Sequence, residues 1–283
     1  LQIVELGFRV YILEKQPGMG GVMAQLDKIF PTNDCSLCLL SPKLVECGRR
    51  RNVEILTRAE LVRVAGEEGN FTVTVRQAPK YIDMDKCIAC DKCSEVCPKA
   101  VPNDFNLGLN MRPAAYIMFD QSVPLKYVID AEHCLRLKRN IGGACDKICP
   151  TQAIDFNDSE TVHDIHVGSI ILAPGSRPVD ASIYQNLGYQ KFQDVVTGLE
   201  YERLIAASGP FKGTLKRMSD FAPPQKIAWL LCVGSREINR QDHAYCSSIC
   251  CMYAMKQAVM FLDAPQAKDR EAAIFFMDLR THG

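Results

Sequence analysis

Four closely spaced cysteines limit what this chain can fold into more than any other feature of its sequence. They follow the pattern Cys87-x2-Cys90-x2-Cys93-x3-Cys97, and Pro98 comes directly after the last of them. Gaps of two residues let a tight loop wrap thiolates around one corner of a cubane iron–sulfur cluster, while a cysteine followed by proline ligates a neighbouring cluster. Zinc sites also use Cys-x2-Cys, but rarely in this rhythm closed by proline. The spacing therefore predicts iron–sulfur ligands rather than structural zinc or free thiols.

A downstream group of cysteines repeats the ending of this motif. Cys134 is followed by Cys145-x3-Cys149, which is again closed by a proline. In the crossover typical of two-cluster ferredoxins, the last cysteine of one motif completes the cluster of the other. We therefore expect Cys149 to join the first three cysteines of the upstream motif in one 4Fe–4S site.

The second site of this pair is short of one ligand. The same crossover assigns Cys97, Cys134 and Cys145 to it, and Gly142 stands where a full motif has a fourth cysteine. Glycine offers no ligand, so three outcomes stay open. The site holds a three-iron cluster, it recruits another ligand such as His133, or its cluster is lost.

A third group of cysteines lies near the end of the sequence. Cys232 closes an apolar run, and Cys246, Cys250 and Cys251 fall at the start of a helix expected over 247–261. On a helix, residues four apart share a face, so Cys246 and Cys250 can reach one metal. Cys251 lies about 100° further round and is the weakest of the four. We expect a third 4Fe–4S cluster here, with buried free thiols as the alternative.

This third group occupies a position that has another use in dinucleotide-binding folds. The junction between strand and helix there carries the sequence G-x-G-x-x-G, which lets the pyrophosphate approach the backbone. In this chain Cys232–Glu237 fills the position and two of the three glycines are missing. The sequence thus predicts the strand and helix of a nicotinamide domain without its phosphate fingerprint.

The remaining cysteines form no complete ligand set. Cys35-x2-Cys38 and Cys47 lack an obvious fourth partner. They are either buried thiols or, for Cys35 and Cys38, ligands to a cluster whose other cysteines lie outside this chain.

The composition supports a reduced metal protein. Fourteen cysteines in 283 residues are too many for ordinary packing, and 47% apolar residues suffice for a core without disulfides. Lys plus Arg equals Asp plus Glu at 33 each, so nothing points to a nucleic acid or a membrane surface as partner. No apolar run is long enough to span a bilayer. We expect a cytoplasmic protein whose two ends, Leu1 and Gly283, are cut from a longer chain.

Apolar and alternating runs predict an α/β fold with a parallel sheet. We expect strands over 9–13, 53–56, 71–75, 167–172, 226–233 and 273–279. Between the third and fourth of these, the cysteine-rich segment has little regular pattern. The predicted division is 1–80 and 158–224 as two segments of one nucleotide-binding domain, 81–157 as an inserted iron–sulfur module, and 225–283 as a second, cysteine-bearing domain.

A glycine-rich turn near the start of the chain suggests a nucleotide site. Glu14 ends an expected strand, and a carboxylate at this place in a dinucleotide fold holds a ribose hydroxyl. Taken alone, Glu14 is more simply explained as a solvated charge. Gly20 and Gly21 follow it in a turn where a ligand can approach the backbone.

Three stretches resemble the A-type subunit of heterodisulfide reductase (HdrA). They are Glu14–Asp27, Phe30–Cys35, and Cys232–Arg236 together with the Tyr245–Tyr253 segment that carries the later cysteines. The resemblance covers essentially the whole chain. It implies a thioredoxin-reductase-like fold of two dinucleotide domains that binds FAD, with a ferredoxin-like module inserted. The implied flavin contacts are Glu14, Lys15, Gly20, Gly21, Met23, Ala24, Ala173, Pro174 and Gly175.

The resemblance also implies a function and partners. It suggests an FAD and iron–sulfur electron-transfer subunit that splits electron pairs at the flavin. Implied partners are the other subunits of a heterodisulfide reductase complex, a hydrogenase or dehydrogenase, and ferredoxin, within an assembly that contains more than one copy of the chain. Related subunits serve quinone-interacting and aromatic-ring-reducing complexes. Two alternatives remain: an NAD(P)H-dependent iron–sulfur flavoprotein, which the lost glycines near Cys232 disfavour, and a non-catalytic zinc scaffold.

Overall fold

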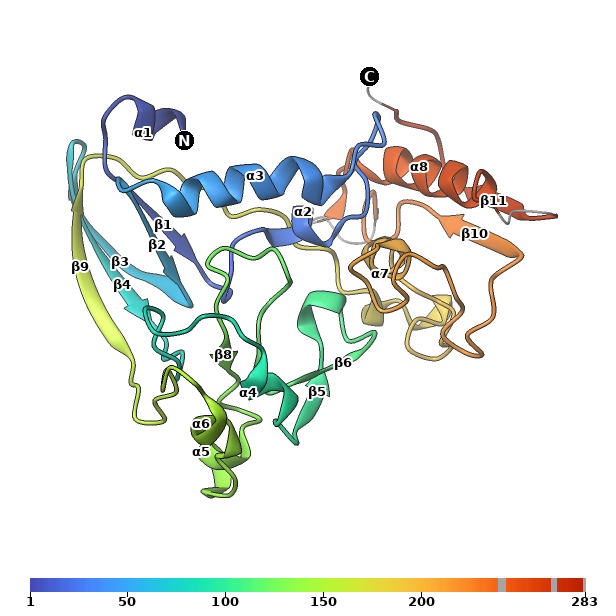
Figure 1. Cartoon of the computed structure of the whole chain (residues 1–283). Helices are drawn as coiled ribbons and strands as arrows, with labels where there is room; N and C mark the ends of the chain where they lie inside the picture. The colour runs from blue at the N-terminus through green and yellow to red at the C-terminus, as the bar shows by residue number, and fades with distance from the viewer. Residues whose placement is uncertain (239–242, 266–268, 282–283) are drawn as a thin grey trace. The chain divides into compact units, whose positions relative to one another are not determined.

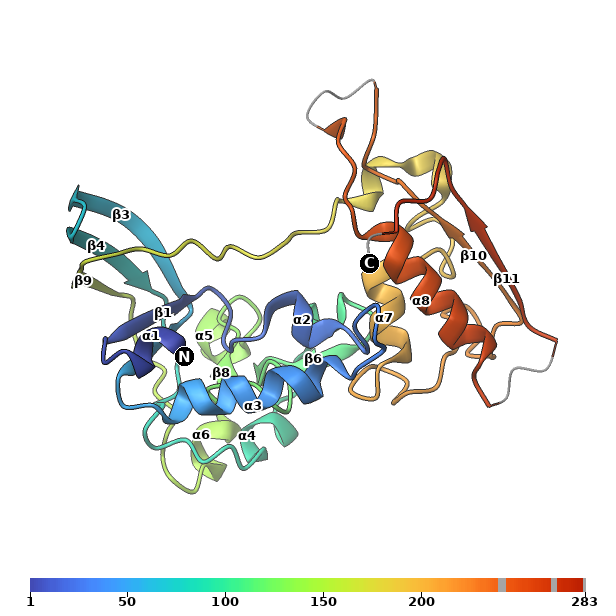
Figure 2. The same cartoon turned by 90° about the horizontal axis from the view of Figure 1, so that it is seen from above.

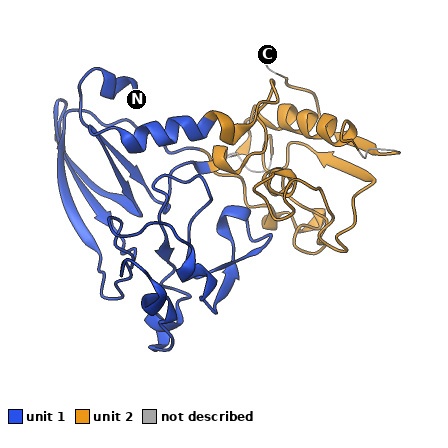
Figure 3. Ribbon diagram, in the orientation of Figure 1, with its two compact units in different colours: residues 1–21, 40–175 blue, residues 22–39, 176–283 orange. Residues whose placement is uncertain are grey.

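The structure of the chain is a computed structural model that describes residues 1–238, 243–265 and 269–281. Contacts divide it into two compact units, shown in blue and orange in Figure 3. Unit 1 comprises 1–21 and 40–175, and unit 2 comprises 22–39 and 176–283. The four-part division expected from the sequence stays a prediction.

The first strands of unit 1 form a parallel pair (Figure 1). After the short helix α1 (Gln2–Glu5), β1 (Val10–Glu14) pairs with β2 (Val53–Thr57). The register runs from Val10 opposite Val53 to Glu14 opposite Thr57. Parallel strands need a long crossover connection, which here contains α2 (Gly21–Gln25) and α3 (Ser36–Arg49). The strands expected over 9–13 and 53–56 are confirmed.

A three-stranded antiparallel sheet follows in unit 1. β3 (Ala59–Glu67) and β4 (Asn70–Gln77) form a hairpin, and β9 (Thr161–Val167) pairs with the other edge of β4. Alternation along β4 buries Val73 and Val75, as the pleat of a strand with one covered face requires. The expected strand over 71–75 is confirmed.

The expected buried strand over 167–172 is wrong. β9 ends at Val167, and the chain continues as an extended segment without a strand partner among the described residues (Figure 2). Ile171 and Leu172 are 70% and 80% exposed. An apolar run becomes a strand only where a neighbouring strand takes up its backbone hydrogen bonds. Ala173, Pro174 and Gly175 therefore lie in an exposed, irregular stretch.

The cysteine-rich segment between β4 and β9 folds from short elements. Its two ends are fastened together, because the amides of Lys80 and Tyr81 both donate to Asp158 Oδ2, at 2.7 and 2.9 Å. A one-residue bridge joins Ile82 to Ile154 just inside them. The elements are α4 (Lys92–Glu95), β5 (Ala100–Pro102), a 3-10 turn (Asp104–Asn106), β6 (Met111–Pro113), β7 (Ala115–Tyr116), β8 (Val128–Ile129), α5 (Leu135–Arg139) and α6 (Ala144–Ile148).

Unit 2 contains a second parallel pair of strands. β10 (Lys226–Leu230) pairs with β11 (Glu271–Phe275), and α8 (Cys250–Leu262) packs on β11. α7 (Gly198–Ile205) begins with a reciprocal capping box between Thr197 and Glu200. Short 3-10 turns at Ala181–Ile183 and Gln185–Leu187 precede it. The expected strands over 226–233 and 273–279 are present but shorter, and the second begins two residues earlier.

The core of unit 2 centres on the only tryptophan of the sequence. Trp229 packs edge-on against Tyr201 and Phe261. Its indole N–H donates to Gln257 Oε1 at 2.9 Å, which satisfies a polar group that would otherwise be costly to bury.

The mixed α/β class with parallel strand pairs is confirmed, and the arrangement of two complete dinucleotide domains stays a prediction. In the described part of the chain, no helix has the length and apolar character needed to cross a membrane.

Candidate metal centres

Four cysteine side chains line one pocket in the segment between β4 and β9. They are Cys87, Cys90, Cys93 and Cys149, the same four that the crossover pattern groups together. The rest of the wall is mainly apolar and consists of Ile82, Ile88, Lys92, Tyr127, Thr151, Ala153 and Ile154. Four thiolates around an apolar pocket are the ligand set that a 4Fe–4S cluster uses, so these residues fit the group. Their role as ligands stays a prediction.

The loop that carries three of these cysteines has an unusual backbone. Ala89 and Asp91 both have positive φ angles, of 54° and 67°, in the left-handed region that favours glycine. This curl places Cys87, Cys90 and Cys93 around one pocket, the last of them within α4. Among the described residues, no three His, Cys, Asp or Glu side chains gather closely enough to hold a single metal ion.

The thiols of this site differ in acidity. Burial, with smaller contributions from Cys87 and Cys145, raises the pKa of Cys93 to about 12. Burial also opposes ionisation of Cys149, but hydrogen bonds from the Ala153 amide and the Thr151 side chain outweigh it and lower the pKa of Cys149. Metal ligands must be thiolates, so loading this pocket releases protons, and Cys93 gives up its proton less readily than Cys149.

Two residues distant in sequence hold the ligand loop, and sequence reasoning missed both. Lys126 Nζ donates to the backbone carbonyl of Cys87 at 2.5 Å. The hydroxyl of Tyr127 donates to the carboxylate of Asp91, and burial raises the pKa of Tyr127 far above its usual value. They lie 39 and 36 residues from their partners, and no motif spacing indicates them.

The second cysteine group lies against the same small core. Cys97, Cys134 and Cys145 pack on it, and α6, which carries Cys145, contacts α4. Burial raises the pKa of Cys145, and the nearby Cys134 and Cys97 act in the same direction. The structure thus brings together the three cysteines expected at this site.

The position of the absent fourth cysteine is open. Gly142 has a φ of +94°, and a Cβ built there meets nothing within 4 Å. The alternative ligand His133 has its Nδ1 3.1 Å from Asp130 Oδ2, a contact that a histidine bound to a metal through Nε2 also makes. The geometry leaves the choice between a three-iron cluster, a recruited ligand and a lost cluster as the sequence left it.

Three of the four cysteines in the third group come together in unit 2. Cys250 and Cys251 are buried in the first turn of α8, and Cys232 packs on the same cluster of side chains. Burial raises the pKa of Cys232, and the neighbouring Cys250 adds to the rise. Burial opposes ionisation of Cys250 too, yet hydrogen bonds from Ser247 and the Cys232 amide lower its pKa.

Cys246 differs from its expected place. α8 begins at Cys250 rather than at 247, so Cys246 lies in the preceding irregular segment, where Ser248 N donates to its sulfur at 3.4 Å. The helical argument that Cys246 and Cys250 share a face is therefore wrong. Ser248, with a φ of 61°, breaks the helix before Cys246 is reached. Cys246 stays a predicted ligand on its sequence motif alone.

Two arginines contact cysteines of the third group. The Arg236 side chain pairs with Asp278, and its hydrogen bond to Cys232 is one of the causes that hold the pKa of Arg236 above its usual value, after the bond to Asp278. The backbone amide of Arg280 donates to Cys251 Sγ at 3.4 Å. The Arg236 side chain acts to lower the pKa of Cys232, but burial and the neighbouring Cys250 outweigh it.

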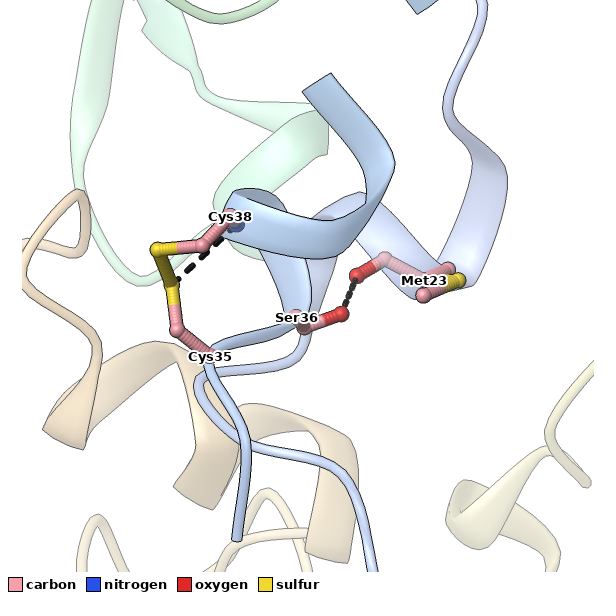
Figure 4. Close-up of a disulfide and its surroundings, with 4 residues drawn as sticks. All are labelled: Met23, Cys35, Ser36 and Cys38. Carbon is pink, nitrogen blue, oxygen red and sulfur yellow. Dashed lines mark hydrogen bonds between the residues drawn. A yellow bond between two sulfur atoms is a disulfide. The ribbon is translucent and has the colours of Figure 1, made fainter. Parts of the chain in front are cut away.

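Cys35 and Cys38 form a disulfide at the start of α3 (Figure 4). Cys38 N also donates to Cys35 Sγ at 3.2 Å, and Ser36 Oγ donates to the carbonyl of Met23 at 2.5 Å. This differs from the two free sulfurs expected, because a disulfide has no thiolate to offer a metal. A ligand role for the pair requires its reduction first. Cys47, further along α3, is a half-buried free thiol.

The glycine turn fits a nucleotide in part. Gly20 and Gly21 have φ angles of 147° and 54°, and a Cβ at Gly21 meets nothing within 4 Å, so the backbone there is accessible. Glu14 ends β1, and its Oε1 accepts the amide of Gln16 at 2.8 Å. Ala24, however, is completely buried, backbone and side chain alike, so a ligand has no access to it where the chain places it.

The other residues expected to contact the flavin bond to neighbouring residues or lie exposed. Lys15 pairs with Glu60 at 3.2 Å on the surface, and the Met23 carbonyl accepts the hydrogen bond from Ser36. Ala173, Pro174 and Gly175 are exposed and form no strand end. The flavin site as a whole stays a prediction.

Comparison with known proteins gives the family. A family model described as a 4Fe-4S binding domain matches residues 80–102. The chain is 42% identical over all 283 residues to the A-type subunit of H(2):CoB-CoM heterodisulfide,ferredoxin reductase from Methanothermobacter thermautotrophicus, covering 42% of that relative. It is also 42% identical to the A-type iron-sulfur subunit of CoB--CoM heterodisulfide reductase from Methanocaldococcus jannaschii, again covering 42% of it.

A third relative shows the same full coverage of the chain. It is the A-type subunit of Ferredoxin/F(420)H(2)-dependent CoB-CoM heterodisulfide reductase from Methanosarcina acetivorans, 36% identical over 284 aligned residues, of which the chain covers 35%. The chain thus spans well under half the length of the curated relatives it matches. Over its whole length, the chain belongs to the family of heterodisulfide reductase A-type (HdrA) subunits.

Proposed function

We propose that this chain is the flavin-binding and iron–sulfur-binding part of an electron-transfer subunit of a heterodisulfide-reductase-type oxidoreductase. It carries FAD and two or three iron–sulfur clusters, and it passes electrons between the flavin and the clusters. A bound cubane accepts and releases one electron at a time, whereas a flavin handles two. One flavin served by two separate cluster regions provides the two exits that electron splitting requires.

One observation carries this proposal. Cys149, remote in sequence, lines the same pocket as Cys87, Cys90 and Cys93. Zinc fingers and ribbons take their ligands as two paired knuckles. A set of three closely spaced cysteines completed by one from a second motif is the pattern of two-cluster ferredoxins. The match of residues 80–102 to a 4Fe-4S binding domain supports the same interpretation.

The flavin part rests on the glycine turn and on the relatives. A turn with positive φ at Gly20 and Gly21, and open space beside Gly21, after a strand that ends in Glu14 suits a dinucleotide. The resemblance of Glu14–Asp27 to the flavin-binding segment of the family supports FAD as the occupant.

The partners follow from what the relatives are named for. Those names mention ferredoxin, hydrogen and F420H2 together with heterodisulfide reductase. We propose that this chain likewise works in a complex with disulfide-reducing subunits and exchanges electrons with ferredoxin or a hydrogenase or dehydrogenase.

Anaerobic reconstitution with iron and sulfide tests the proposal. We expect labile sulfide and iron in about equal amounts, low-spin cluster signals by electron paramagnetic resonance after reduction, and a flavin spectrum in the acid extract. Cys149→Ala should abolish one cubane signal. Cys47→Ala is the matched control, because Cys47 is a free thiol in α3 that does not line the pocket.

Two results would contradict it. Tight zinc binding with no iron uptake would show a structural zinc protein. An unchanged cluster content in Cys149→Ala would show that the crossover grouping is wrong, even if iron is bound.

A further inference from the structure

The ligand loop of the first site contains two residues with unfavourable backbone conformations. Both residues that flank Cys90 have left-handed backbone angles, Ala89 at 54° and Asp91 at 67°, although neither is glycine. Side chains with a Cβ adopt this region at a cost in free energy. Such backbone persists only where the surroundings determine it, so something in the structure must hold this loop.

Two adjacent residues contact both halves of the loop. Tyr127 donates its hydroxyl hydrogen bond to the carboxylate of Asp91, one of the two left-handed residues. Lys126 donates from Nζ to the carbonyl of Cys87 at 2.5 Å, before the first turn of the loop. The two contacts thus lie on either side of Cys90.

The segment that bears these residues is itself rigidly placed. Tyr127, Val128 and Ile129 are 5%, 1% and 1% exposed. β8 (Val128–Ile129) pairs with β7, and Ile129 N donates to the carbonyl of Lys80 at 3.0 Å. Tyr127 also forms part of the pocket wall. A fixed support of this kind can hold strain in a loop that it contacts.

We propose that Lys126 and Tyr127 are positioning residues of the first cluster site. Tyr127 keeps Asp91, and with it the turn between Cys90 and Cys93, in the left-handed conformation. Lys126 fixes the Cys87 carbonyl and places a positive charge beside the ligand loop. Both residues act through the loop that carries the cysteines.

The inference rests on the proposed function, since it presumes a cluster at Cys87, Cys90, Cys93 and Cys149. The tyrosine part is tested on reconstituted full chain by the rate of cluster loss to a chelator, followed by visible absorbance. Tyr127→Phe removes only the hydroxyl and leaves the ring in place. A hydrogen bond to a charged group is strong enough that its loss should speed cluster loss about tenfold.

A rescue variant separates this role from simple packing. Glycine adopts positive φ without strain, so Asp91→Gly removes the need for the tyrosine contact. We expect Tyr127→Phe combined with Asp91→Gly to lose its cluster at close to the wild-type rate. Tyr127→Phe with a wild-type rate, or a fast rate that Asp91→Gly does not slow, would overturn the inference for Tyr127.

The lysine part is tested by the reduction potential of the first cluster, measured by electron paramagnetic resonance during a redox titration. A positive charge nearby stabilises the reduced, more negative cluster, so Lys126→Met should shift the potential to more negative values. Lys86→Met is the matched control: Lys86 is next to Cys87, but its side chain is 59% exposed and pairs with Asp83 at 3.3 Å, where water screens its charge.

The outcomes distinguish the two claims. If the wild-type chain assembles no cluster at this site, the proposed function fails and no variant is needed to show it. If the cluster forms and Lys126→Met shifts the potential no more than Lys86→Met does, the proposed function stands and the inference for Lys126 is refuted.

Discussion

A buried ion pair in unit 2 allows a quantitative prediction about stability. Lys256 Nζ lies 2.5 Å from Glu202 Oε1, and the two side chains are 4% and 2% exposed. Gln257 Nε2 also donates to Glu202 Oε1, at 2.6 Å, and the Asp27 amide donates to Oε2 at 3.1 Å. Glu202→Gln keeps the volume but removes the charge, so Lys256 is left buried without its counterion.

The expected cost is large because both side chains are almost completely buried, so water cannot solvate the charge that is left behind. Breaking a buried pair by removing one member destabilises a protein by about 3–5 kcal/mol. The chain provides an exposed pair for comparison. Lys226 Nζ and Glu271 Oε1 lie 2.7 Å apart, with side chains 70% and 65% exposed. Exposed pairs contribute roughly 0.2–1 kcal/mol, so Glu271→Gln should cost less than about 1 kcal/mol.

Trp229 makes the assay specific for unit 2. It is the only tryptophan in the sequence, it is 7% exposed, and it bonds to Gln257, which itself bonds to Glu202. Urea unfolding followed by tryptophan fluorescence therefore reports on this network. With a slope of about 1–3 kcal/mol/M, Glu202→Gln should lower the urea midpoint by at least about 1 M.

One result would refute the reasoning. If Glu202→Gln and Glu271→Gln lower the midpoint equally, burial does not govern the contribution of these pairs. As a further check, Glu202→Leu combined with Lys256→Met should recover part of the loss, since Lys256 is then no longer a buried charge without its counterion.

Three further predictions concern the clusters and a buried carboxyl group. Cys246→Ala should abolish the third cluster signal as completely as Cys232→Ala does, because a cubane needs four thiolates; retention of the signal would remove Cys246 from the ligand set. Burial and then Glu202 raise the pKa of Asp27, so the folded state favours the protonated carboxyl group, and the stability that this group contributes is lost as the pH rises through the raised pKa. The urea midpoint of Asp27→Asn should therefore decline less over this pH range than the midpoint of the wild type. Parallel curves of midpoint against pH would contradict the assignment. Stripping iron with a chelator should make residues 81–157 the first segment cut in limited proteolysis, since ligand binding contributes directly to folding; an unchanged cleavage pattern would contradict a structural role for the clusters.

The sequence predicts correctly those strands that an apolar or alternating run of residues marks. β1, β2 and β4 lie close to where apolar or alternating runs place them. The run over 167–172 failed for a different reason. Apolar residues indicate that a segment prefers burial, but a strand also needs a neighbour in register. Ile171 and Leu172 have none among the described residues.

The same distinction applies to the cysteine sites: local spacing predicts ligands, whereas contacts between residues far apart in the sequence are not predicted. The spacing of Cys87, Cys90 and Cys93 is imposed by the cluster that a loop must surround, and the second motif identifies Cys149. The helix start that displaces Cys246 depends on how the turn before it folds, which spacing does not encode. The contacts of Lys126 and Tyr127 depend on the conformation of the segment between β7 and β8, which no pattern in the sequence predicts.

The way the cysteine-rich segment joins β4 and β9 has an evolutionary consequence. Gln77 and Thr161 face each other as the last pair of an antiparallel ladder, so the chain leaves and re-enters at points about 5 Å apart. A turn of a few residues can bridge that gap without changing the register of either strand. Gain, loss or exchange of the whole segment therefore requires only one change in the gene, at a hairpin tip. The pairing of β3, β4 and β9 therefore does not depend on what the segment between β4 and β9 carries.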